Sequence, residues 1–63
     1  MTALTYTQFL NSLGWFKISS FASYDKAMIR RYTLSVIHIN YEYVLLENLY
    51  VVDDKWEIWE KSR

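Results

Sequence analysis

The chain has 63 residues, of which 52% are hydrophobic and 19% aromatic, with seven basic and seven acidic side chains. It contains no cysteine and a single histidine, which excludes disulfides, thiolate metal sites and histidine-rich sites. We expect one small domain over residues 1–63, stabilised by apolar burial alone.

Charge is unevenly distributed along the chain. Up to Ile39, four basic residues stand against one acidic residue, a balance of +3; from Asn40 onward, three stand against six, a balance of −3. A surface with two signs of charge can steer and orient a partner. The charge pattern therefore favours an interaction function.

No membrane or targeting segment is predicted. The longest uncharged stretch, Met1 to Phe16, is interrupted by six polar side chains and has no basic start. Together with the lack of cysteine, this favours a cytoplasmic protein.

The first predicted element is an amphipathic helix from Thr5 to Leu13. Thr5 and Gln8 have the spacing of a capping box, with the threonine as N-cap. Gly14, the only glycine, stands where the residue after a helix often has a positive φ angle.

Residues 15–21 have an extended pattern, and 22–26 are predicted to connect this strand to the next element. A competing interpretation begins a second helix after Ser23 and continues it through Arg31, since Tyr24, Ala27, Met28 and Arg31 permit helical spacing.

Residues 32–39 form the clearest predicted strand, because they alternate along the chain and are rich in β-branched side chains. Two shorter strands are predicted at 42–46 and 49–52. The last segment is either the return strand of a hairpin, Trp56 to Glu60, or a helix capped by Asp54 over 55–61; the β-rich composition favours the strand.

The predicted fold class is therefore α+β. One short N-terminal helix would pack on a small antiparallel β-meander of three to five strands.

Catalytic and cofactor-binding motifs are not apparent, so we expect a protein that is not an enzyme and that holds no cofactor or metal. His38 has no suitably placed serine, since Ser35 would point to the other face of a strand. Adjacent acids such as Asp53 and Asp54 are ordinary in a turn, and no glycine-rich phosphate loop is present.

The favoured hypothesis is a protein-binding module, such as a small inhibitor, an antitoxin-like protein or an adaptor of the kind found in phages and mobile elements. Aromatic anchors ringed by charge are typical of interface hot spots. The partner would be a protein with a basic surface, and the candidate binding residues are Tyr50, Asp53, Asp54, Trp56, Glu57, Trp59 and Glu60.

Two alternatives remain open. A nucleic-acid-binding sheet would use Lys17, Arg30, Arg31 and Tyr32, although a neutral chain has few cations for phosphate contacts. A structural homodimer would cover the aromatic side chains that so small a core leaves exposed.

Overall fold

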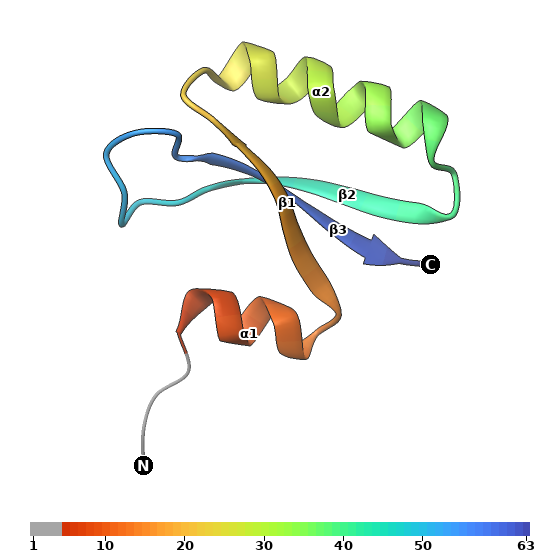
Figure 1. Cartoon of the computed structure of the whole chain (residues 1–63), viewed down its shortest axis with the longest axis horizontal. Coiled ribbons are helices and arrows are strands. Elements are labelled where there is room, and N and C mark those ends of the chain that lie inside the picture. The colour runs from red at the N-terminus through yellow and green to blue at the C-terminus, as the bar shows by residue number, and fades with distance from the viewer. Residues whose placement is uncertain (1–4) are drawn as a thin grey trace.

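Residues 5–63, which the computed structural model describes, form two helices and an antiparallel sheet of three strands (Figure 1). Met1–Leu4, the start of the uncharged N-terminal stretch, lie outside the described residues. The elements are α1 (Tyr6–Ser12), β1 (Trp15–Phe21), α2 (Tyr24–Ile37), β2 (Tyr41–Glu47) and β3 (Trp56–Ser62). The α+β class is confirmed.

Helix α1 has the predicted start and end. The Thr5 hydroxyl accepts a hydrogen bond from the Gln8 backbone N–H at 3.1 Å, and the Gln8 side-chain oxygen accepts one from the Thr5 N–H at 2.9 Å. Gly14 follows the helix with a φ of +93°. The capping box and the glycine together set the seven-residue length of this helix.

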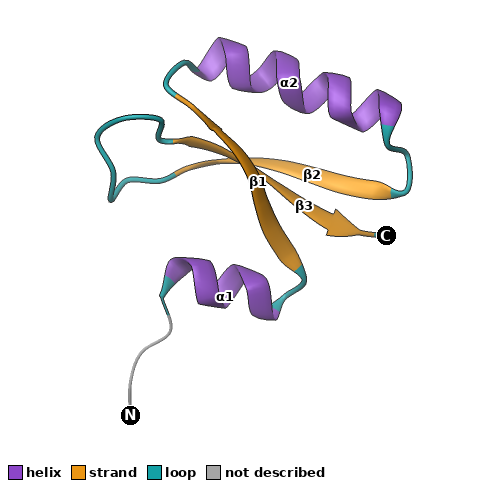
Figure 2. Ribbon diagram, viewed as in Figure 1, coloured by secondary structure: helices purple, strands orange, loops and turns teal. Residues whose placement is uncertain are grey.

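The sheet is not a meander, so this part of the prediction is wrong. Strand β3 lies in the centre, between β1 and β2, and is antiparallel to both. Strands β1 and β2 therefore run parallel to each other, and parallel strands need a crossover connection. Helix α2 provides that crossover, which is visible in Figure 2 above the sheet.

The strand predicted over residues 32–39 is also wrong, because helix α2 continues to Ile37. The competing helix after Ser23 is confirmed, with the Ser23 hydroxyl accepting from the Lys26 N–H at 3.5 Å. Apolar side chains lie on both faces of α2, so Tyr32, Leu34 and Val36 alternate in sequence as they would in a strand.

From β2 onward, some of the predicted elements are confirmed and others are wrong. The strands at 42–46 and 56–60 are confirmed as parts of β2 and β3, and the helix capped by Asp54 does not form. The strand predicted at 49–52 is instead part of a loop, because the Asn48 side-chain oxygen accepts from the Tyr50 N–H at 2.9 Å and turns the chain locally.

The two helices cover opposite faces of the sheet (Figure 1). Tyr24 of α2 packs edge-on against Trp56 with ring centroids 4.9 Å apart, and Tyr6 of α1 packs against Trp59 at 5.9 Å. Alternate residues of a strand point to opposite faces, so β3 supplies both layers of the interior. Among the described residues, the buried apolar side chains are Ala27, Leu34, Ile58 and Trp59.

Candidate functional site

A buried carboxylate organises the α1 face of the sheet. Glu57, on the central strand, is only 3% exposed. Its Oε1 accepts from Trp59 Nε1 at 3.0 Å, its Oε2 accepts from Asn48 Nδ2 at 3.0 Å, and Lys17 Nζ lies 3.6 Å from Oε2. A buried charge is tolerated when it is paired and hydrogen-bonded in this way.

Asn48 connects the buried Glu57 carboxylate to the loop between β2 and β3. Besides donating to Glu57, it accepts from Tyr50 through its side chain and donates from its backbone to the Lys55 carbonyl at 2.7 Å. The Lys55 ammonium lies 2.9 Å from the Glu47 carboxylate and 5.7 Å from the centroid of the Trp56 ring. The base of the loop is therefore held from several directions.

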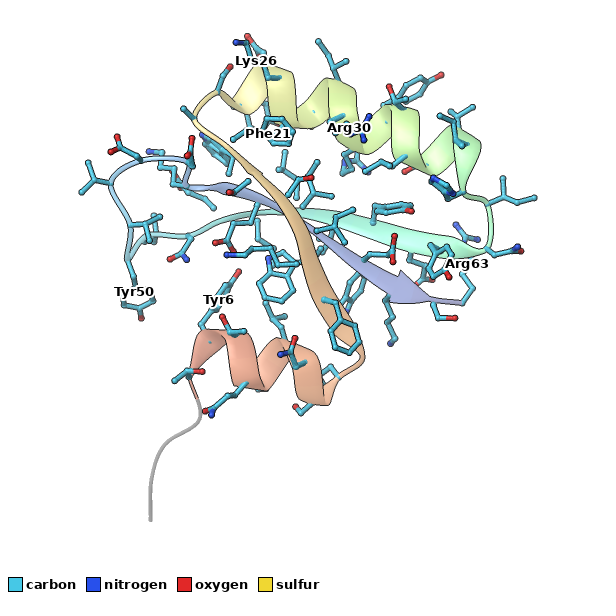
Figure 3. All side chains as sticks on the ribbon, in the orientation of Figure 1. Tyr6, Phe21, Lys26, Arg30, Tyr50 and Arg63 are labelled. Carbon is cyan, nitrogen blue, oxygen red and sulfur yellow. The ribbon has the colours of Figure 1, made fainter. Side chains whose placement is uncertain are left out.

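The outer part of this loop, residues 49–54, is named here the tip loop. Leu49, Tyr50 and Val52 are 78%, 89% and 93% exposed, which is unusual for large apolar side chains that follow one another so closely. Asp53 and Asp54 are exposed beside them. Figure 3 shows Tyr50 projecting from the bend of the loop, away from the sheet.

A groove separates the tip loop from α1. It consists of two adjoining hollows of about 670 and 450 Å³, and both are lined by Tyr6, Asn48 and Tyr50. Burial, and then the negative charge of Glu57, raise the pKa of the Tyr6 phenol, so that it stays protonated. The groove therefore offers two aromatic rings, as Figure 3 shows, and a neutral hydroxyl.

The structure separates the seven residues predicted to bind a protein. Trp59 is 1% exposed and Glu57 is also buried, so both belong to the interior. Tyr50, Asp53 and Asp54 lie in the loop and are exposed. The remaining two, Trp56 and Glu60, are partly buried on the sheet face that α2 covers.

Glu60 is engaged within the molecule. Its Oε2 accepts a hydrogen bond from the Tyr43 hydroxyl at 2.9 Å. Burial, followed by this hydrogen bond and the charge of Glu60, raises the pKa of Tyr43 to about 12. This pair is a link between β2 and β3 rather than a surface group.

Sequence reasoning missed the apolar members of the tip loop and the groove residues. Leu49 and Val52 were expected inside a strand, and no site role was expected for Tyr6. Asn48 was the available signal, because asparagine favours turns with side-chain to backbone hydrogen bonds.

The residues of the nucleic-acid alternative are not brought together. Arg30, Arg31 and Tyr32 are on α2. Lys17 is on β1. It pairs with Glu57 on the sheet face that α1 covers, which is opposite to the face that α2 covers. A continuous sheet of stacked aromatics and cations, as that hypothesis requires, is not formed by these four residues.

Within residues 5–63, no three acidic or histidine side chains gather where they could hold a metal ion. Neither α1 nor α2, the helices of this described part, is long and apolar enough to cross a membrane. No protein-family model matches the chain, and no curated protein or solved structure is significantly similar to it.

Proposed function

We propose that this chain is a non-enzymatic protein-binding module that inserts its tip loop into an apolar recess of a partner protein. One observation supports this most directly, namely the 78–93% exposure of Leu49, Tyr50 and Val52 on a loop whose base is held. Fully burying an aliphatic or aromatic side chain contributes about 1.5–3 kcal/mol. Burying these three against a partner would therefore give a substantial driving force.

The rim of the partner's recess would be basic. Asp53 and Asp54 follow the apolar residues directly, and neither forms an ion pair within residues 5–63. Glu47 differs, because Lys55 already neutralises it. Unpaired rim charges mainly increase the association rate and select the partner.

The anchoring of the loop base supports a role in tight binding. Ordering a flexible loop on association costs free energy, and a loop that is already ordered avoids part of that cost. The Asn48 side chain donates to Glu57 and accepts from the Tyr50 backbone N–H, and these two hydrogen bonds fix residues 48–50 before any partner arrives.

The buried carboxylate supports a structural role rather than a catalytic one. A general acid or base must exchange protons with a substrate, which requires access and a free oxygen lone pair directed toward it. Both oxygens of Glu57 already interact with Trp59, Asn48 and Lys17. A cytoplasmic location is part of the proposal.

The test is an affinity purification from the native host, followed by binding measurements with the protein that is captured. We expect Tyr50→Ala to weaken that binding by roughly 2 kcal/mol, about 30-fold, as for an interface hot spot. Asp53→Asn with Asp54→Asn should slow association and reduce its salt dependence. Ile39→Ser, which alters a 70% exposed residue outside the loop, is the matched control.

Two results would reject the proposal. One is a captured protein whose affinity is the same for the wild type and for a Tyr50→Ala, Val52→Ala double variant. The other is micromolar binding to generic DNA or RNA at physiological salt with a steep salt dependence, which would favour the nucleic-acid alternative.

A further inference from the structure

Helix α2 has an apolar face that the rest of the molecule does not cover. Ala27 and Leu34 are buried against the sheet, whereas Ile29, Tyr32 and Val36 are 68%, 70% and 60% exposed. We name these three residues the outer stripe. Figure 1 shows α2 as an outer layer, with only one of its sides against the sheet.

The spacing of the outer stripe is that of a helix-packing seam. Within α2, Ile29, Tyr32 and Val36 are separated by three and four residues, so they lie on one side of the helix. This alternation is the heptad pattern of coiled coils, in which one helix inserts side chains between those of another. The residues at the repeating first position, Ile29 and Val36, are β-branched, as two-stranded packing favours.

The flanks of the stripe are uncharged along most of its length. Thr33 and Ser35 border it, and no acidic or basic residue lies between the positions of Ile29 and Val36 on the same side of the helix. Two such stripes can meet without burying a charge. A partner helix with a charged face would find no oppositely charged residue in the outer stripe.

We propose that the outer stripe of α2 packs against the same stripe of a second copy, forming a two-fold symmetric homodimer. A two-fold contact uses the same patch on both subunits, so the patch must be self-complementary, and an uncharged apolar seam satisfies this condition. The formal net charge of zero means that two copies approach without overall repulsion.

The small interior explains why the occupant is a second copy. Four buried apolar residues are a minimal core for the described chain, and oligomerisation is one way in which domains below about 70–80 residues supplement such a core. This need arises whenever the chain folds, whether or not another protein is present. Another molecule of the same chain carries the same outer stripe and is present wherever the chain is.

The first experiment is sedimentation equilibrium of the full chain over a wide concentration range. We expect the wild type to dimerise and Ile29→Glu or Val36→Glu to raise the dimer dissociation constant at least about tenfold. Val52→Glu, which places the same charge on an exposed residue of the tip loop, should leave the constant unchanged. Circular dichroism establishes that each variant is folded.

The second experiment applies even if the glutamate variants unfold. The chain contains no cysteine, so a single one can be introduced without background. Tyr32→Cys, at the middle of the stripe, should form a disulfide-linked dimer under oxidising conditions much faster than Val52→Cys, although both positions are exposed.

Several results would overturn the proposal. They are a wild type that stays monomeric at every concentration, a dimer that persists in folded glutamate variants, and cross-linking that is as fast at Val52→Cys as at Tyr32→Cys. The proposed partner binding through the tip loop does not depend on this dimer, so Ile29→Glu should still bind the partner.

Discussion

The carboxylate of Glu57 joins three segments that are distant in sequence, since it contacts Lys17 of β1, Asn48 of the loop and Trp59 of its own strand. Leaving one partner of a buried hydrogen bond unsatisfied costs about 1–3 kcal/mol. A single side chain therefore couples the stability of the sheet to the position of the tip loop.

The substitution Glu57→Gln should destabilise the fold by about 1–3 kcal/mol. The amide keeps one acceptor oxygen but directs an N–H donor toward Asn48 or Trp59, which are themselves donors here. Urea unfolding measures the change, with Glu42→Gln, at an exposed position, as control. Equal stabilities of the two variants would contradict the structural role of the buried carboxylate.

Trp59 and Tyr50 were placed together on the predicted binding surface, but the structure assigns them opposite surroundings. Trp59→Ala should destabilise the fold by about 3–5 kcal/mol, because a buried indole is lost and Glu57 loses a hydrogen-bond donor. Tyr50→Ala should change stability by less than about 0.5 kcal/mol, as for other exposed side chains. Chemical denaturation of both variants under the same conditions tests the contrast.

The Tyr43 phenol should make stability fall at high pH. Its pKa is about 12 in the folded chain, against an ordinary value of 10.0 that applies when the chain is unfolded. The unfolded state therefore releases this proton first, so the contribution is complete below pH 10 and is lost as pH rises toward 12. Unfolding free energies measured across this range should decrease more steeply for the wild type than for Tyr43→Phe, and parallel curves would contradict the assignment.

At the scale of elements, the sequence was sufficient where local chemistry decides the structure. The Thr5 and Gln8 pair and Gly14 determine α1 through short-range hydrogen bonds and backbone geometry. Strands β1, β2 and β3 were also predicted, because their sequences have the patterns and composition of extended segments.

The junction between α1 and β1 offers a test of this local control. A Cβ atom at position 14 would meet only Lys61 side-chain atoms at 3.5 Å or more, so space does not require glycine there. The φ of +93° does, since it is unfavourable for residues with a Cβ. Gly14→Ala should cost about 1–2 kcal/mol in urea unfolding, and Gly14→Asn less, because asparagine tolerates positive φ.

The competing interpretation located the start of helix α2 after Ser23, but the continuation of this helix from Arg31 to Ile37 could not be predicted by the same means. Its outer stripe makes both faces apolar, which removes the contrast between a buried and a solvated side that identifies an amphipathic helix. The order of the strands in the sheet could not be predicted from local sequence patterns either. That β3 lies between β1 and β2 depends on the α2 crossover, and no local pattern encodes it.

The candidate site was predicted only in part. Asp53, Asp54 and Tyr50 were found because acids and aromatics are visible in composition, and the loop exposes them. The burial of Glu57 and Trp59 depends on which strand is central and on α1 covering that face, which are both tertiary facts. Leu49 and Val52 are exposed in a loop whose start is turned by a hydrogen bond from the Tyr50 N–H to the Asn48 side chain, which the hydrophobic pattern does not reveal.

At the scale of the whole molecule, the described chain is a thin body, with Cα extents of 41, 29 and 11 Å. Such a shape has much surface for its volume, and few of its apolar side chains reach the interior. Stability and self-association should therefore be linked, because a second copy adds the burial that the single chain lacks.

This linkage predicts that the melting temperature depends on protein concentration. If the folded dimer unfolds to separate chains, mass action raises the wild-type melting temperature as concentration increases. Ile29→Glu should melt at one temperature throughout, because its outer stripe no longer pairs, and Val52→Glu should follow the wild type. Calorimetry or far-ultraviolet circular dichroism at several concentrations provides the measurement. A wild-type melting temperature that is the same at every concentration would mean that the two sheet faces, covered by α1 and α2 alone, are sufficient to stabilise the monomer.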